Sequence, residues 1–170
     1  MVVGVPAVST RWPLPSSVAD TAPELPRPDV PLMAASIELS DALAAIDLPK
    51  CVASSGTPEK IHHGLTCAGL YDQLAPHIFS AVQVTRGKPA PDLFLFAAAR
   101  MRVSPERCLV IEDSVPGITA ARAADMTVLG FHGGSHCRPG YAETLRAAGA
   151  AITFDDMRQL PDLIGQIGAN

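Results

Sequence analysis

One strand-to-helix segment constrains the fold of this chain more than any other. Residues 108–111 form a short apolar run with β-branched side chains, which is typical of a buried strand. Two carboxylates, Glu112 and Asp113, follow directly. Ser114 can then cap a helix, and Pro116 suits its first turn. This order indicates a parallel α/β sheet, with both carboxylates at the carboxyl edge where such sheets bind ligands.

The chain from residue 36 onward repeats this alternation of strand and helix. Further strands are expected at residues 50–53, 78–82, 126–131 and 151–154. Helices are expected from a cap at Ser36 to Pro49, from a cap at Thr57 to residue 68, at 92–101, 116–124 and 141–148, and from 157 onward. The pattern predicts a three-layer, Rossmann-like parallel sheet with helices on both faces.

The N-terminal part has a different composition. Seven of the sixteen prolines fall within residues 1–31, a density that opposes regular helix or central strand. We therefore expect an irregular arm over residues 1–35 and an α/β core domain over residues 36–170. Residues 1–5 could form a short strand, but the arm is expected to add little to the core.

Length and charge narrow the class of protein. A chain of 170 residues is long enough for one domain with a sizeable core. The net charge of −4 and the absence of a basic run argue against nucleic acid or an anionic membrane as the main partner. The sequence contains neither a long apolar span nor a secretory signal. The four cysteines show no CxxC spacing, so free thiols in the cytoplasm are expected.

Three loops after expected strands carry residues suited to phosphate chemistry. Ser54 and Ser55 precede an expected helix N-terminus, which is a natural phosphate site. Lys88 lies between glycine and proline, where a fixed positive charge can face a phosphoryl group. Glu112 and Asp113 suit a hard cation such as Mg²⁺. A hydroxyl group, a cation and a pair of acids follow one another in this order along the chain. Together they make up a set of groups suited to phosphoryl transfer.

Each feature also has an ordinary interpretation. The serines can form a turn and cap, Lys88 can be a surface charge, and the acid pair can be a solvated loop. The co-occurrence of all three favours the functional interpretation. His132, His136 and Cys137 could suggest a zinc site, but no second ligand cluster accompanies them, which favours a solvated loop.

At residues 52–55, 87–92 and 110–117 the sequence resembles the haloacid dehalogenase-like hydrolase superfamily. The likeness is to the branch of β-phosphoglucomutase and phosphoglycolate phosphatase, and it extends from about residue 36 to residue 160. The lysine and acidic motifs are specific together, whereas the serine motif is weak alone.

The resemblance implies a role for each residue and a small phosphorylated metabolite, such as a sugar phosphate, as substrate. Ser54 and the Ser55 N–H would hold the transferring phosphate, and Lys88 would neutralise phosphate and nucleophile. Asp113 would bind Mg²⁺ directly, and Glu112 would support the ion directly or through water.

The sequence also departs from the family. Reaction there begins with an aspartate nucleophile in a DxDx(T/V) motif at the end of a first, central strand. No DxD occurs before Ser54, and neither Asp20 nor Asp29 follows a credible strand. The helical cap that normally sets substrate identity is also missing. The chain thus looks like the C-terminal portion of such an enzyme, preceded by a foreign or degraded N-terminal arm.

Without the central strand, two inner strand edges would lack partners. Residues 1–5 or another segment could fill the gap, the sheet could close, or the chain could be unstable alone. Three functional hypotheses follow: a Mg²⁺-dependent phosphohydrolase, a non-catalytic phosphate- or metal-binding module, and a truncated product without function of its own. We expect weak binding of Mg²⁺ and phosphate, and very slow turnover or none.

Overall fold

The computed structural model describes residues 4–6 and 34–168. Its strands are β1 (Gly4–Pro6), β2 (Val52–Ser54), β3 (Ile78–Ser80), β4 (Cys108–Glu112), β5 (Thr127–Phe131) and β6 (Ile152–Phe154). Its α-helices are α1 (Ala34–Ala44), α2 (Pro58–Cys67), α3 (Tyr71–Leu74), α4 (Asp92–Met101), α5 (Val115–Ala123), α6 (Tyr141–Ala147) and α7 (Leu160–Gly168). Three short 3₁₀ helices are η1 (Ala81–Gln83), η2 (Pro105–Arg107) and η3 (Met157–Gln159).

The strands form two hydrogen-bonded pieces of sheet. One piece pairs β2 with β3 in parallel, and the other has the order β1-β4-β5-β6. β4, β5 and β6 are parallel to one another. β1 runs antiparallel to β4, with Gly4 opposite Val110 and Pro6 opposite Cys108. The predicted parallel α/β fold is confirmed for the core, and β1 is the exception in direction.

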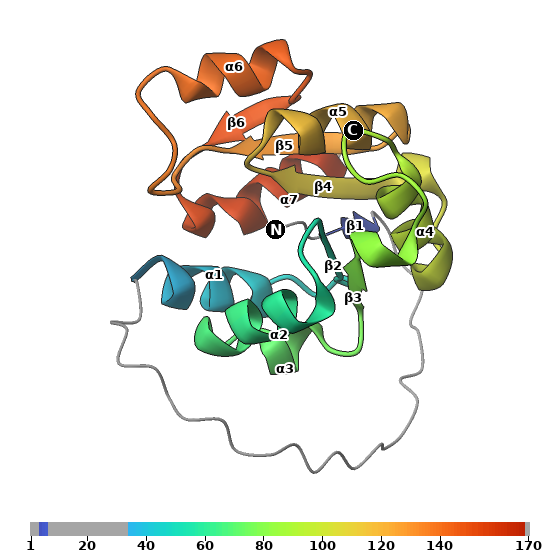
Figure 1. Ribbon diagram of the computed structural model, residues 1–170. Helices are drawn as coiled ribbons and strands as arrows, with labels where there is room; N and C mark the ends of the chain where they lie inside the picture. The colour runs from blue at the N-terminus through green and yellow to red at the C-terminus, as the bar shows by residue number, and fades with distance from the viewer. Residues whose placement is uncertain (1–3, 7–33, 169–170) are drawn as a thin grey trace.

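Helices cover both faces of this sheet (Figure 1). Successive side chains of a strand point to opposite faces. In β4, Cys108 and Val110 belong to an apolar cluster with residues of α4, α5 and α6. Leu109 and Ile111 belong to a second cluster, with residues of α1, α2, α3 and α7. This alternation produces the three predicted layers, because each face of the strand is buried under different helices.

The same alternation shows that the two pieces of sheet share one layer. In β2, Ala53 lies in the first cluster, with Cys108 and Val110 of β4. Val52 lies in the second cluster, with Leu109 and Ile111 of β4. Among the described strands, β2 has a hydrogen-bonded partner on the β3 side only. The sheet is therefore interrupted between β2 and the β1–β4 pair, the region in which the sequence predicts a missing central strand.

β1 pairs with β4 in the region of the sheet where the missing strand was expected. The arm is not wholly separate from the core, because Gly4–Pro6 pairs with β4. This corrects the expectation that the whole of residues 1–31 adds little to the core, and it agrees with a short strand near residues 1–5. The expectation for the rest of the arm, residues 7–33, lies outside the described residues.

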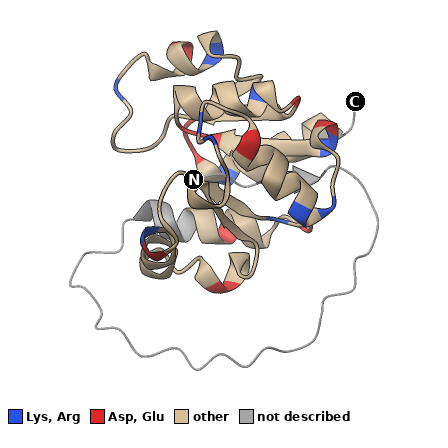
Figure 2. Ribbon diagram, turned by 45° about the vertical axis from the view of Figure 1, so that its right-hand side comes forward, with Lys and Arg blue, Asp and Glu red and all other residues tan. Residues whose placement is uncertain are grey.

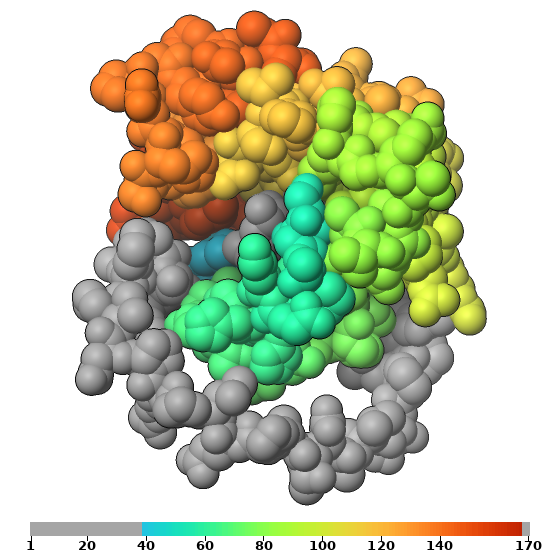
Figure 3. Space-filling model, viewed as in Figure 1, coloured from blue at the N-terminus to red at the C-terminus, as the bar shows by residue number. Residues whose placement is uncertain are grey.

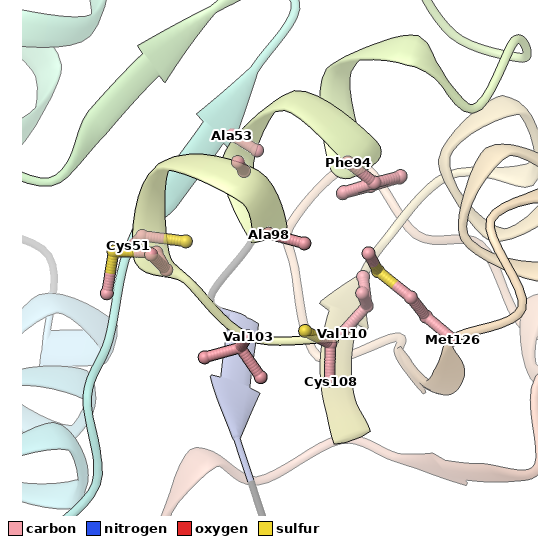
Figure 4. Close-up of a pocket in the computed structure, with 10 residues that line it drawn as sticks. Cys51, Ala53, Phe94, Ala98, Val103, Cys108, Val110 and Met126 are labelled. Carbon is pink, nitrogen blue, oxygen red and sulfur yellow. The ribbon is translucent and has the colours of Figure 1, made fainter. Parts of the chain in front are cut away.

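A small apolar pocket marks the interruption. Cys51 and Ala53 line it from the β2 side, and Cys108 and Val110 line it from β4 (Figure 4). Residues of α4, together with Val103 and Met126, complete the lining. The pocket therefore lies between the two pieces of sheet, where the hydrogen bonding of the described strands is interrupted.

Most element boundaries agree with the sequence prediction, and α4 does so at both ends. Three predictions were wrong. α1 begins at Ala34 and ends at Ala44, rather than running from a cap at Ser36 to Pro49. Thr57 has the extended backbone of an N-cap, but its side chain makes no capping hydrogen bond. The strand expected to reach residue 82 ends at Ser80, where η1 begins. Helix α3 was not predicted.

The surface carries charges of both signs. Figure 2 shows Lys and Arg intermixed with Asp and Glu over the described elements, without one basic face. None of the helices that the structure describes is long and apolar enough to cross a membrane.

The pairing of β1 with β4 leads to a test of stability. We expect that replacing residues 1–6 by a Gly-Ser segment of equal length lowers the free energy of unfolding by about 1–3 kcal/mol, since a few strand hydrogen bonds contribute about 1 kcal/mol each. Urea unfolding measures the loss, and amide hydrogen exchange should become faster in β4. Unchanged exchange of the β4 amides would show that β1 does not contribute to the core.

Candidate active site

The loop between β2 and α2 holds the two predicted phosphate-binding serines. Ser54 is the last residue of β2, and its Oγ accepts a hydrogen bond of 3.2 Å from the Gly56 N–H. Ser55 is exposed. The loop leads into the N-terminus of α2, where unpaired N–H groups favour an anion. Figure 3 shows this teal segment on the surface of the molecule.

Lys88 is a buried cation and not a surface charge. Its side chain is only 7% exposed. Nζ donates hydrogen bonds to the Ala53 carbonyl, at 3.1 Å, and to Glu112 Oε1, at 2.5 Å. Nζ also lies 4.8 Å from the centre of the Phe94 ring, within range of a cation–π interaction. These contacts fix the ammonium group between the ends of β2 and β4.

Glu112 is more deeply buried, with 1% of its side chain exposed. Oε1 accepts from Lys88, and Oε2 accepts from the Ser114 hydroxyl at 2.7 Å. The Ser114 Oγ also accepts from the Gly117 N–H, so the predicted helix cap is confirmed. A side chain at Gly117 would overlap the Glu112 carboxylate, which explains why glycine occupies this first turn.

Asp113 differs from its neighbour because its side chain is 34% exposed. His136 Nε2 lies 3.5 Å from Asp113 Oδ2, and Cys137 Sγ lies 3.5 Å from the same His136 nitrogen. The loop after β5 thus reaches the acidic pair. Burial raises the pKa of the Cys137 thiol, and the nearby Asp113 carboxylate adds to that shift.

Tyr141, at the start of α6, also faces this group. Burial raises the pKa of its phenol first, and the negative charges of Cys137, Asp113 and Glu112 raise it further. The phenol therefore remains protonated and able to donate a hydrogen bond at neutral pH.

Two of the predicted site residues, Lys88 and Glu112, are in direct contact, and Asp113 follows Glu112 in the chain. The hydrogen bond from Lys88 to Ala53 O joins this pair to the residue before Ser54. The three predicted loops therefore lie at one edge of the sheet. The roles of these residues toward a phosphate or a metal remain predictions.

The acid pair fits a Mg²⁺ ion only in part. Each Glu112 oxygen already accepts one hydrogen bond, from Lys88 or from Ser114, and the side chain is buried. Asp113, with 34% of its side chain exposed, is the more accessible carboxylate of the pair. Across residues 4–6 and 34–168, no three His, Cys, Asp or Glu side chains gather as a metal site. Mg²⁺ can bind through one or two carboxylates together with water and substrate phosphate, so a weak site on Asp113 is consistent with these residues.

Sequence reasoning missed two residues that shape this edge. Ser80, at the end of β3, is buried and donates a hydrogen bond of 2.6 Å to the Gly56 carbonyl. Gly117 makes room for the Glu112 carboxylate. Gly117 lies within the acidic motif and could have been noted there, whereas only the long-range contact reveals Ser80.

Comparison with known proteins identifies the family of this chain. A family model described as haloacid dehalogenase-like hydrolase matches residues 19–125. The chain belongs to this family. The matches to curated phosphatases and to a β-phosphoglucomutase support the branch predicted from the sequence.

Three relatives illustrate the match. The chain is 32% identical to 6-phosphogluconate phosphatase of Escherichia coli (strain K12), over 71% of this chain and 52% of that protein. It is 45% identical to β-phosphoglucomutase of Bacillus subtilis (strain 168), over 31% of this chain and 24% of that protein. A solved hydrolase of the family from Deinococcus radiodurans, with bound phosphate and sodium, has a TM-score of 0.71 and 36% identity, covering 80% of this chain and 60% of that one. The chain thus spans only about half of 6-phosphogluconate phosphatase.

The buried ion pair leads to a first site prediction. Lys88→Met leaves the Glu112 carboxylate buried without its cation, so the free energy of unfolding should fall by about 3–5 kcal/mol. Combining it with Glu112→Gln should restore part of the loss. Arg86→Met is the matched control, because the Arg86 side chain is exposed and its pair with Asp92 should contribute much less to stability. Equal losses for Lys88→Met and Arg86→Met in urea unfolding would contradict the structural role of Lys88.

The glycine beneath Glu112 gives a second prediction. Gly117→Ala forces the Glu112 carboxylate away from its partners and should destabilise the chain by about 1–3 kcal/mol. Gly64→Ala is the control, because Gly64 lies exposed within α2 with open space around it. That change should stabilise the chain by about 0.5–1 kcal/mol. Thermal unfolding of both variants distinguishes them, and a neutral Gly117→Ala would contradict the packing described.

Proposed function

We propose that this chain carries the phosphate-binding and metal-binding part of a phosphatase or phosphomutase-type site for a small phosphorylated metabolite. The observation that carries the proposal is the position of Lys88. A buried ammonium group is held by Glu112 and the Ala53 carbonyl at the edge where the Ser54–Ser55 loop and Asp113 also lie. Such a fixed charge favours the charge that develops on a phosphoryl group in its transition state.

Each residue has a distinct role in this proposal. Ser54 and the Ser55 N–H hold phosphate oxygens beside the N-terminus of α2. Lys88 neutralises charge on the phosphoryl group. Asp113 binds Mg²⁺. Glu112 fixes the position of Lys88, and it supports the ion through a water molecule. When bound, Mg²⁺ would supply positive charge to the phosphate oxygens.

The substrate class rests on relatives. The names of 6-phosphogluconate phosphatase and β-phosphoglucomutase refer to sugar phosphates, and the Deinococcus hydrolase holds phosphate. We therefore propose a sugar phosphate or a similar small metabolite, with neither nucleic acid nor membrane as partner. We also propose a cytoplasmic setting, in keeping with the free thiols of Cys67, Cys108 and Cys137.

We further propose that these 170 residues by themselves turn over phosphate esters very slowly or not at all. The DxD motif that supplies the covalent nucleophile in the family does not occur before Ser54. Loss of such a nucleophile typically costs several orders of magnitude in rate, and the other groups do not recover it. A non-catalytic module that binds phosphate or metal is the second candidate, and the missing motif is the observation that favours it.

Turnover of p-nitrophenyl phosphate and a panel of sugar phosphates, with and without Mg²⁺, tests this proposal. We expect very slow hydrolysis or none by the purified chain, and loss of Mg²⁺ binding in Asp113→Ala by calorimetry. A slow Mg²⁺-dependent rate that Asp113→Ala abolishes would favour the enzyme, and phosphate binding without turnover would favour the module.

Two substitutions in the arm serve as controls. Asp20→Asn and Asp29→Asn should leave any residual rate unchanged, because neither aspartate has the sequence context of the family's nucleophile. Rapid hydrolysis that either change abolishes would show that the arm supplies the nucleophile. Rapid hydrolysis that survives both, but not Asp113→Ala, would indicate attack by metal-bound water.

A further inference from the structure

Ser80 and Glu112 are buried polar residues, with 3% and 1% of each residue exposed. Both occupy the carboxyl end of a strand, and Glu112 already belongs to the candidate site. Ser80 ends β3 and lies opposite Ser54 in the register of the β2–β3 pair. A buried hydroxyl is costly unless its hydrogen bonds are made, so its partners indicate what it stabilises.

The Ser80 hydroxyl connects two loops at this edge. It donates to the Gly56 carbonyl at 2.6 Å, across 24 positions of sequence, and accepts from the Val82 N–H at 3.3 Å. The Ser80 N–H in turn donates to Gln83 Oε1 at 2.8 Å, and the two residues form a capping box at η1. Hydrogen bonds to Val82 and Gln83 therefore fix Ser80 within its own loop. Its hydroxyl in turn fixes the loop after β2 through the Gly56 carbonyl.

Gly56 is constrained from both sides as a result. Its carbonyl accepts from Ser80, and its N–H donates to Ser54 Oγ. These bonds fix the peptide groups on either side of Gly56, next to the exposed Ser55. They also leave the Ser54 hydroxyl proton available, since the bond from Gly56 uses the oxygen as acceptor.

We propose that Ser80 is the positioning residue of the phosphate-binding loop, acting through the Gly56 carbonyl. This inference rests on the proposed function and names a residue that lies outside the three sequence motifs. Without the Ser80 hydroxyl, the Gly56 carbonyl loses its buried donor, and the loop loses the orientation in which Ser54 and Ser55 face an anion.

The test is the affinity of the full 170-residue chain for inorganic phosphate, measured by isothermal titration calorimetry. Ser80→Ala should weaken binding about tenfold, as loss of a supporting hydrogen bond commonly does. Ser80→Thr, which keeps the hydroxyl, should restore binding to within about threefold of wild type. Gln83→Ala changes an exposed residue, and it should weaken binding by a smaller factor by freeing the Ser80 backbone.

A control separates positioning from stability. Val128→Ala creates a cavity in β5 and should lower the melting temperature while leaving phosphate affinity unchanged. Equal phosphate affinity of wild type and Ser80→Ala would overturn the role of Ser80 alone. Equal weakening in Val128→Ala would also overturn it, because the effect would then follow stability. Absence of phosphate binding by the wild type would overturn the proposed function and this inference together.

Discussion

The buried contact between Lys88 and Glu112 is the interaction on which the rest of the structure depends. It joins two pieces of sheet that no backbone hydrogen bond connects among the described strands, since Lys88 also binds the Ala53 carbonyl of β2. A buried ion pair is stabilising only when its remaining hydrogen bonds are satisfied. Ser114 satisfies the second Glu112 oxygen, and Gly117 leaves room for it. The same contacts that hold the fold together therefore also fix the charges of the candidate site.

The interrupted sheet shows how the core is maintained around this pair. Alternate side chains of β2 and β4 belong to the same two apolar clusters. The helical layers are therefore continuous across the place where the hydrogen bonding of the sheet is interrupted. β1 pairs with β4 over three residues and in the opposite direction. The pocket lined by Cys51, Ala53 and Val110 lies at this interruption of the sheet.

Local signals predicted much of this architecture. α4 has the boundaries expected from Asp92 and the apolar run that follows, and Ser114 forms the predicted cap. Both depend on residues close together in sequence. The partner and direction of β1 depend on β4, about a hundred residues away, and could not be inferred from the proline-rich arm. Thr57 has the expected backbone but not the expected hydrogen bond, which shows that propensity alone does not determine capping.

The candidate site was accessible to sequence reasoning for a related reason. Lys88, Glu112 and Asp113 lie in compact motifs after strands, and the topology of parallel sheets brings such loops to one edge. The burial of Lys88 and its contact with Glu112 could not be predicted from the sequence, because they join segments that are distant along the chain. They are the basis for our proposal that Asp113 is the metal-facing acid and Glu112 its support.

The central claim is that phosphate binds at the edge formed by the ends of β2 and β4 and the Lys88 loop. Amide chemical-shift mapping of the ¹⁵N-labelled chain during titration with inorganic phosphate tests it most directly. The account predicts that the largest shifts occur at Ser54, Ser55 and Gly56, with smaller shifts at Lys88 and Asp113. Shifts confined to other surfaces, or none at saturating phosphate, would contradict it.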